Sequence, residues 1–284
     1  MDNIGLVLEG GGMRGIYTSG VLDFLMEKDI YTPYVIGVSA GACNASSYVS
    51  KQKYRSRDVN LKYINDPRYI GIKNLILEKS IFSIKFLYDE VPNKLEPFDY
   101  EEFKKSNQTF MIVATNCKTG EPEYFEKNQC KDILKVIRAS SSLPLVTPIV
   151  NLDGEPYLDG GISDSIPIKK AMEDGYTKNI VVLTRTKGYR KEPIKHKRII
   201  KFKYKKYPKL VNKIFNRYKE YNETLDYIED LEKKGQIIII RPSEDLKVDR
   251  LEKNVDKLEA LYNLGYNDAK QAYNRIKTML KEQK

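Results

Sequence analysis

The 284-residue sequence contains no tryptophan, one histidine and three cysteines. The cysteines, Cys43, Cys117 and Cys130, are odd in number and have no C-x-x-C spacing. This argues against a zinc site or a disulfide framework and favours free thiols in a reducing compartment. No apolar run has the length of a membrane span, and no signal-like leader follows Met1. We therefore expect a cytoplasmic protein that uses no metal or other cofactor.

The scarcity of histidine limits the choice of catalytic base. His196 lies in the segment KEPIKHKR, where lysine and arginine side chains crowd around it. A general base has to be held in a fixed geometry, which a highly charged loop does not provide. A Ser-His-Asp triad is therefore not expected, and a carboxylate is the preferred candidate for a base.

Positive charge is concentrated in one segment. Residues 185–219 contain fifteen Lys or Arg and one acid, so the rest of the chain is near −4 although the net charge is +10. Aromatic residues alternate with the lysines, as in an interfacial segment: Phe202, Tyr204, Tyr207 and Phe215. We expect residues 185–219 to contact anionic membrane peripherally. The same pattern is found in nucleic-acid-binding segments and in solvated surfaces, but nucleic acid is not expected as a partner.

Hydrophobic periodicity predicts an α/β fold. Strands at 4–8 and 34–39 alternate with helices in the first fifty residues, which indicates a βαβ unit with a parallel pair. Further strands are predicted at 109–116, 122–126, 155–159, 179–184 and 236–242. Helices are predicted at 132–143, 165–175, 209–228 (one helix or a pair) and 249–282. No repeat or flexible linker divides the chain, so we expect a single domain over residues 1–284. Its catalytic core covers about 4–185, and a basic and helical extension, 186–284, packs on that core.

A glycine-rich loop, GGGMRG, follows the first strand. Its G-x-G-x-x-G pattern at a helix start is typical of a phosphate cradle, but a dinucleotide site also needs an acid at the end of the second strand. Ser39 occupies that place. A P-loop would need Lys and Ser or Thr after Gly15, where the chain has Ile16 and Tyr17.

The second strand ends in GVSAG, which matches the G-x-S-x-G nucleophile elbow. Such a turn holds the serine in a strained conformation and exposes its hydroxyl. Side chains at Gly37 or Gly41 would collide with a neighbouring strand or helix. The N–H of Ala40 and the positive end of the following helix then face the serine oxygen. The alternative is a glycine pair that only packs the helix closely against the strand.

The candidate base is Asp159, which ends the predicted strand EPYLD and precedes Gly160 and Gly161. Functional sites in open parallel sheets form at the carboxyl ends of strands. A carboxylate is competent as a base only where burial raises its pKa and the oxyanion is stabilised. This predicts an apolar pocket, to which Tyr and Leu residues of 61–100 are candidates to contribute. The alternative for Asp159 is an ordinary Asp-Gly turn.

Together, GGGMRG, GVSAG and DGG, with IRASSSLPLVTPIV before the aspartate and DGGISDSIPI after it, resemble the patatin-like phospholipase family over residues 4–185. The resemblance implies a three-layer fold with a mostly parallel central sheet flanked by helices. It implies a Ser39–Asp159 dyad and calcium-independent hydrolysis of acyl esters of glycerolipids through an acyl-enzyme. Backbone N–H groups of one loop would bind the oxyanion, namely those of Gly10, Gly11, Gly12, Met13 and Arg14.

Three classes of function follow from the sequence. The preferred one is a serine acyl hydrolase whose substrate is a lipid or other acyl ester. The second is a hydrolase or acyltransferase for small soluble esters. The third is a non-catalytic module that binds lipid or nucleotide.

Overall fold

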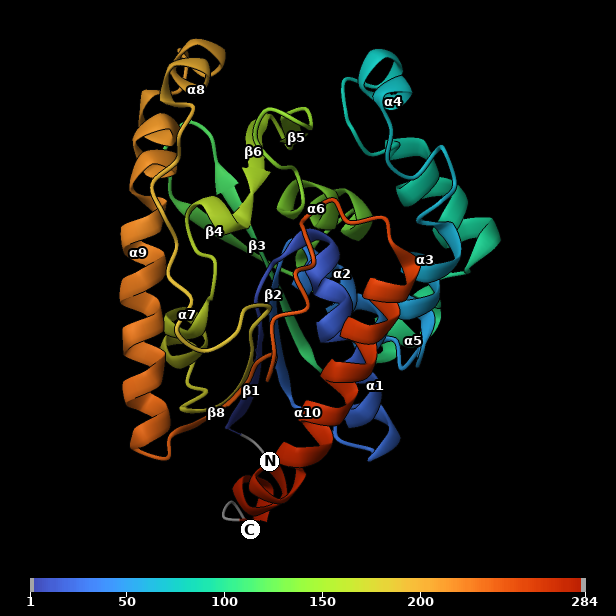
Figure 1. Ribbon diagram of the computed structural model, residues 1–284, viewed down its shortest axis with the longest axis vertical. Coiled ribbons are helices and arrows are strands. Elements are labelled where there is room, and N and C mark those ends of the chain that lie inside the picture. Colours follow the sequence, from blue (N-terminus) through green and yellow to red (C-terminus); the bar gives the residue numbers. More distant parts are fainter. Residues whose placement is uncertain (1–2, 282–284) are drawn as a thin grey trace.

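One eight-stranded sheet forms the centre of the computed structural model, which describes residues 3–281 (Figure 1). The strand order is β5-β6-β3-β2-β1-β7-β8, and β4 pairs with β3. Strands β1, β2, β3, β7 and β8 are parallel, whereas β4 and β6 run antiparallel to β3 and β5 antiparallel to β6. The strands are β1 (Ile4–Leu8), β2 (Tyr34–Val38), β3 (Thr109–Asn116), β4 (Pro122–Glu126), β5 (Val150–Leu152), β6 (Glu155–Asp159), β7 (Lys178–Val182) and β8 (Ile237–Ile240).

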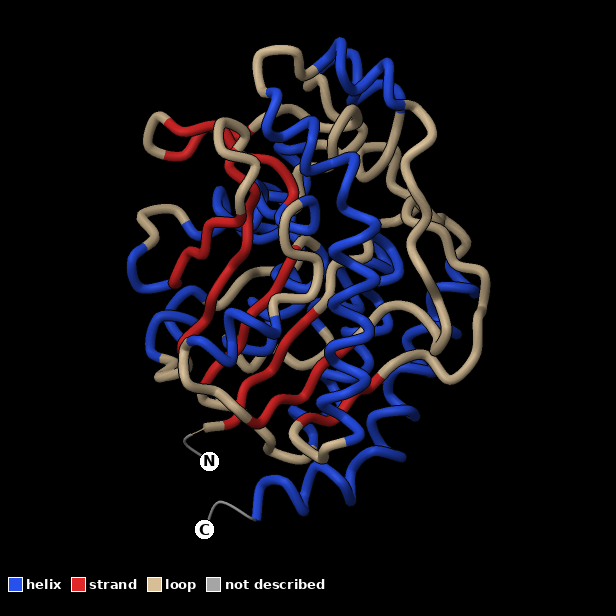
Figure 2. The backbone as a smooth tube through the Cα atoms, turned by 90° about the vertical axis from the view of Figure 1, so that its left-hand side faces the viewer, coloured by secondary structure: helices blue, strands red, loops and turns tan. Residues whose placement is uncertain are grey.

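Helices cover both faces of this sheet (Figures 1 and 2). One face packs against α1 (Ile16–Glu27), α2 (Ala40–Val49), α6 (Ile133–Ser140) and α10 (Val255–Lys281), and the other against α7 (Ile168–Glu173) and α9 (Pro208–Lys233). The remaining helices are α3 (Arg55–Tyr63), α4 (Ile72–Leu77), α5 (Tyr100–Lys105), α8 (Lys197–Lys203), a π-helix (Phe86–Leu95) and short 3-10 turns at Gly12–Gly15, Lys127–Gln129 and Gly160–Ile162.

The two cores follow from the alternation of side chains along the strands. In β1, Leu6 and Leu8 enter the core under α1 and α10, and Val7 enters the core under α9, because successive side chains point to opposite faces. A strand buried on both faces is therefore apolar throughout, which is why IGLVL and IIII lack the polar alternation of a half-exposed strand. The three-layer α/β fold with a mostly parallel sheet is confirmed.

Some elements differ from the sequence-based prediction. The segment from Pro208 forms one long helix, not a pair, and α6 ends at Ser140, short of the predicted end at residue 143. An Asp-Gly hairpin joins β5 and β6, with φ of 47° at Asp153 and 90° at Gly154. β6 is antiparallel to β3, so Asp159 does not reach the site from a parallel strand.

The C-terminal helix α10 approaches α1 closely. A Cβ on Gly20 would lie 2.1 Å from the carbonyl oxygen of Tyr262, and one on Gly265 would lie 2.1 Å from that of Tyr17. The buried Tyr17 hydroxyl donates a hydrogen bond to Asp268 at 2.9 Å. These contacts pack the C-terminal part of the extension on the core. That the chain folds as one unit remains a prediction.

The close contact between α1 and α10 predicts that a Gly-to-Ala change in α10 destabilises the protein, the opposite of its usual effect in a helix. Alanine normally stabilises a helix interior relative to glycine. Gly265→Ala should instead lower the free energy of unfolding by about 1–3 kcal/mol, because the added methyl group overpacks the interface. Urea unfolding measures the effect, with Asn267→Ala at an exposed position of α10 as the control. Unchanged or higher stability of Gly265→Ala would contradict the prediction.

Candidate active site

Ser39 occupies the tight turn between β2 and α2 that the sequence predicts. Its backbone has φ 55° and ψ −123°, a conformation that costs a non-glycine residue about 1–3 kcal/mol. The flanking residues have to be glycines because neighbouring backbone atoms leave no room for a side chain. A Cβ at Gly37 would lie 2.8 Å from backbone atoms of Ala42, and one at Gly41 would lie 2.4 Å from the carbonyl oxygen of Leu8. The strand–turn–helix context of a nucleophile elbow is therefore present.

The Ser39 backbone is fixed by hydrogen bonds on both sides. Its N–H donates to the Ser140 hydroxyl at 2.8 Å, and its carbonyl accepts from the N–H of Cys43 at 3.0 Å. Ser140 is buried and ends α6, so a helix a hundred residues away in sequence positions this turn. Nothing local to the IRASSS segment identified Ser140 as a partner of Ser39.

The pairing of β3 brings Asp159 to Ser39. Residues 109–113 of β3 pair with β2, and residues 114–116 pair with β6. Residues of both stretches also pair with β4, which occupies one of the two edges of β3. β2 and β6 therefore lie end to end along the other edge. Val38 is opposite Val113, and Asp159 is opposite Ala114. The ends of β2 and β6 therefore meet head-on, with Ser39 directly after one end and Asp159 at the other.

Asp159 is buried and only partly hydrogen-bonded. Its Oδ1 accepts the N–H of Gly161 at 2.8 Å, while Oδ2 has no hydrogen-bond partner among residues 3–281. Burial raises the pKa of Asp159 above its ordinary value, and the positive charge of Arg217 and the Ser39 hydroxyl act in the opposite direction. The carboxylate thus faces Ser39 with a free oxygen and an elevated affinity for a proton, which are the properties of a general base.

The glycine-rich loop lies against the same turn. A Cβ at Gly10 would be 3.0 Å from Cβ of Ser39, and Gly10, Gly11 and Gly12 line a small cavity together with Ser39. Gly12 has φ +59° and approaches the carbonyl oxygen of Arg250, which accepts the N–H of Met13 at 3.1 Å. The Met13 N–H is therefore already engaged, which leaves the other predicted N–H groups of the loop as better candidates for an oxyanion.

The remaining predicted residues have packing roles near the turn. A Cβ at Gly15 would lie 2.6 Å from that of Ala40, the first residue of α2. Gly160 passes against the carbonyl oxygen of Val113, and Gly161 leaves room for the guanidinium of Arg217. Arg14 is buried beside the loop and lines the same small cavity.

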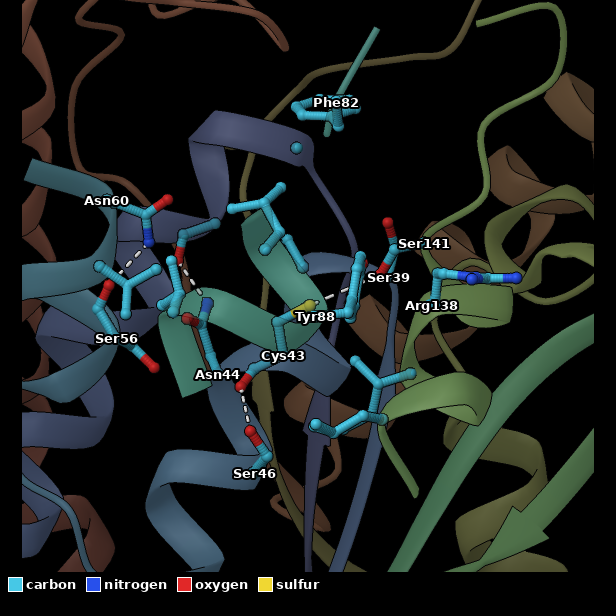
Figure 3. A pocket seen from close by; sticks show the side chains of 18 of the residues that line it. Ser39, Cys43, Asn44, Ser46, Ser56, Asn60, Phe82, Tyr88, Arg138 and Ser141 are labelled. Atoms are coloured by element: carbon cyan, nitrogen blue, oxygen red, sulfur yellow. Dashed lines mark hydrogen bonds between the residues drawn. The ribbon is translucent and has the colours of Figure 1, made fainter. Parts of the chain in front are cut away.

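A mainly apolar cavity of about 190 Å³ opens at Ser39 (Figure 3). Tyr69, Leu87 and Tyr88, from the region in which the sequence predicted pocket residues, line it together with Phe82. Cys43 also faces the cavity, but burial raises its thiol pKa, so it remains protonated. The cavity provides the apolar surroundings that an acyl chain requires. Asp159 does not line it and lies in the small cavity that adjoins it at Ser39.

Other polar residues lie at the site although no motif in the sequence identifies them. Lys191, Arg217 and Arg250 line the small cavity with Ser39 and Asp159. One feature of the sequence could have identified Arg217 as a buried residue. It comes three residues after Ile214 and four before Tyr221, which places it on the apolar face of α9. His196 is exposed at the start of α8 and lines neither cavity.

Within residues 3–281, no three His, Cys, Asp or Glu side chains are grouped as metal ligands. Over the same residues, no helix combines the length and apolar character of a membrane span.

Comparison with known proteins gives matches along most of the chain. A family model for patatin-like phospholipase matches residues 6–172, and one for a domain of unknown function (DUF6363) matches 207–281. The uncharacterized protein YjjU of Escherichia coli is 30% identical over 269 residues, which cover 92% of this chain and 74% of that protein. The probable lipid hydrolase 463L of Invertebrate iridescent virus 6 is 27% identical, over 61% of this chain and 65% of its own length. The structure of VipD from Legionella pneumophila aligns with TM-score 0.47 and 14% identity, covering 95% of this chain and 66% of VipD.

The α/β fold and the family match define the protein class as a lipid acyl hydrolase. The chain belongs to the patatin-like phospholipase family.

The strained turn predicts different stabilities for two substitutions of Ser39. Ser39→Gly relieves the unfavourable backbone conformation, whereas Ser39→Ala keeps it. Ser39→Gly should unfold at higher denaturant concentration, with a free energy of unfolding about 1 kcal/mol above that of Ser39→Ala. Equal stability, or a less stable glycine variant, would show that Ser39 is not strained.

Proposed function

We propose that the protein hydrolyses lipid acyl esters with Ser39 as nucleophile and Asp159 as general base. The observation that carries this proposal is the pairing of β3, which places the ends of β2 and β6 head-on. The unpartnered Oδ2 and raised pKa of Asp159 support its role as a base. The family supports the class of reaction.

The proposed reaction has two half-steps. Ser39 Oγ attacks the ester carbonyl carbon while Asp159 takes the hydroxyl proton, and the carbonyl π electrons move to oxygen to form the oxyanion. N–H groups of Gly11, Gly12 and Ala40 are the proposed donors to this oxyanion, each worth about 3–4 kcal/mol in comparable sites. The oxyanion then collapses, the alcohol leaves with the proton from Asp159, and water hydrolyses the acyl-enzyme by the same route in reverse.

The apolar cavity favours a lipid over a small soluble ester. Its lining includes aliphatic and aromatic side chains from several separate segments, such as Ile84 and Leu87, and it begins at Ser39. An acyl chain that fills it displaces water from apolar surface, which contributes about 25 cal/mol per Å². A short ester would leave most of this surface unused, so turnover should increase with acyl length until the cavity is full.

The dyad predicts that substitutions of Asp159 and of His196 have very different effects on kcat. Asp159→Asn should reduce kcat by about 10²- to 10⁴-fold, because the amide cannot accept the serine proton. His196→Ala should leave kcat unchanged, because His196 is exposed on α8 and outside both cavities. The assay is hydrolysis of a medium-chain glycerolipid ester with products identified by mass.

Folded controls make this test decisive. Loss of activity in a folded His196→Ala variant would overturn the dyad, as would near-normal activity of Asp159→Asn. Fluorophosphonate labelling of wild type against Ser39→Ala separates an enzyme from a non-catalytic lipid- or nucleotide-binding module. A preference for short soluble esters would favour the small-ester alternative.

We also propose that α4 and α8 contact an anionic membrane surface. Both helices lie at the same end of the molecule (Figure 1), and most of their apolar side chains are strongly exposed, although Ile200 of α8 is buried. Ile76 and Leu77 of α4 are 77% and 81% exposed, and Phe202 of α8 is 80% exposed. α8 belongs to the basic segment 185–219. In the sequence, α4 lies between Tyr69 and Phe82, which both line the apolar cavity. Apolar tips among lysines suit the boundary of an anionic bilayer.

Liposome flotation tests this contact. The protein should float with phosphatidylglycerol-containing vesicles, and binding should fall with salt because the lysine contribution is screened. Phe202→Ser and Ile76→Ser should each reduce the bound fraction several-fold, whereas Leu95→Ser, at a partly exposed site on neither helix, should not. Equal binding to phosphatidylcholine vesicles would contradict the electrostatic part, and no binding to either would contradict the contact.

A further inference from the structure

Arg217 of α9 comes close to Asp159, although the two residues belong to distant parts of the chain. The position that a Cβ of Gly161 would occupy is 2.9 Å from Nη2 of Arg217 and 3.0 Å from Oδ1 of Asp159. Because both atoms lie so near to one point, they are within the roughly 6 Å over which an opposite charge changes the proton affinity of a carboxylate. Residue 161 has to be glycine here, since a side chain would fill the space that the guanidinium uses.

The turn that follows Asp159 also holds the guanidinium. Nε and Nη2 of Arg217 donate to the Ser165 hydroxyl at 3.4 and 3.3 Å. That hydroxyl donates to the carbonyl oxygen of Gly161 at 2.7 Å, and the N–H of Gly161 donates to Oδ1 of Asp159 at 2.8 Å. One peptide segment therefore fixes the carboxylate and the guanidinium relative to each other.

Arg217 acts on Asp159 by charge, without a bond to it. Within residues 3–281, Arg217 forms no ion pair, and Oδ2 of Asp159 has no hydrogen-bond partner. A direct ion pair would occupy the carboxylate and weaken it as a base. A positive charge at a somewhat greater distance stabilises the ionised form and leaves Oδ2 free for the hydroxyl of Ser39.

Burial of Asp159 makes such a charge necessary. The side chain lies in a residue that is only 3% exposed, and burial raises its pKa above the ordinary value. A protonated carboxyl group cannot accept the serine proton. Among the effects that lower this pKa, the charge of Arg217 is the largest, ahead of the hydrogen bonds from Ser39 and Gly161.

Other ionisable groups surround Asp159 but are less suited to this role. The small cavity is also lined by Glu9, Arg14, Arg185, Tyr189, Lys191, Tyr221 and Arg250. Cys43 of α2 is close enough that the charge of Asp159 adds to burial in raising its thiol pKa. Arg250 lowers the pKa of Asp159 less than Arg217 does. Burial, followed by the charges of Arg217 and Arg250, lowers the pKa of Lys191 to about 6, so Lys191 is mostly neutral above that pH, where an arginine is still protonated.

Arg217 also comes from a different part of the chain than the proposed dyad. The match to the phospholipase model covers residues 6–172, which include Ser39 and Asp159. Arg217 lies in the match to the domain of unknown function, residues 207–281. The C-terminal extension therefore brings a charge to a site whose nucleophile and base lie in the phospholipase part.

We infer that Arg217 is a positioning residue for the proposed dyad. Its charge keeps Asp159 ionised and able to accept the proton of Ser39, and Ser165 holds the guanidinium where it has this effect. Arg217 itself exchanges no proton. The inference rests on the proposed function, because it assumes that Asp159 is the base.

The test is the pH dependence of kcat/KM for a neutral ester, monohexanoylglycerol, with products identified by mass. The acidic limb of this profile reports the base of the free enzyme. Activity is lost as the pH falls through the pKa of the base, so a base with a higher pKa loses activity at a higher pH. Arg217→Gln should therefore move the midpoint of the acidic limb to higher pH. Its activity relative to wild type should be at least about tenfold lower near pH 6 than near pH 9, whereas a merely structural role would lower activity equally at every pH.

Three further variants sharpen the test. Arg217→Lys keeps the charge and should return the midpoint toward that of wild type. Ser165→Ala removes the hydroxyl that holds the guanidinium, so it should move the midpoint in the same direction as Arg217→Gln but by less. Lys219→Gln removes a positive charge from an exposed position of α9 and should leave the profile unchanged.

Lys191 calls for a double variant. Loss of Arg217 removes a charge that lowers the pKa of Lys191, so this lysine could become protonated and replace the missing charge. Arg217→Gln is therefore also measured together with Lys191→Gln, and the midpoint should move at least as far as in Arg217→Gln alone.

An unchanged midpoint in the folded double variant would overturn the inference, as would an Arg217→Lys profile that coincides with that of Arg217→Gln. If Arg217→Gln does not fold, an unchanged midpoint in Ser165→Ala would overturn it. Near-normal turnover of Ser39→Ala or Asp159→Asn would instead overturn the proposed dyad. Loss of turnover in both of these variants, with no effect of Arg217 on the profile, would overturn the inference alone.

Discussion

The site depends on how β3 shares one of its edges between two strands. β2 pairs with this edge up to Val113, and β6 takes over at Ala114 from the opposite direction. Two chain ends that meet in this way cannot both continue as strands, so β2 turns into α2 and β6 turns into Gly160–Ile162. The turn residues, Ser39 and Asp159, are brought together by backbone pairing. Their proximity is therefore a property of the sheet and does not require a direct bond between the side chains.

Electrostatics links Asp159 to the basic side chains of the small cavity, namely Lys191, Arg217 and Arg250. A buried carboxylate with one unpartnered oxygen favours its protonated form, which would be inactive as a base. The nearby guanidinium of Arg217 opposes that shift and favours the ionised form. The positive charge of Arg217 therefore partly offsets the effect of burial on the pKa of Asp159, the group that we propose as the general base.

Local sequence patterns predicted the turns but not what surrounds them. GVSAG and DGG identify Ser39 and Asp159 because each needs a particular backbone shape and glycines at close contacts. Ser140, Arg217 and Arg250 join the site only through long-range packing, and no spacing in the sequence specifies which helix end or loop meets the elbow. The antiparallel direction of β6 was missed for the same reason, since strand pairing is decided by register between distant segments.

The glycine-rich loop depends on the C-terminal extension for its shape. The Arg250 carbonyl fixes the N–H of Met13 and comes so close to Gly12 that any side chain there would collide with it. The contact with residue 250 therefore contributes to the shape of the loop that we propose to bind the oxyanion. Arg14 and Arg250 also line the small cavity beside Ser39. The C-terminal extension thus shapes both the loop and the cavity next to it.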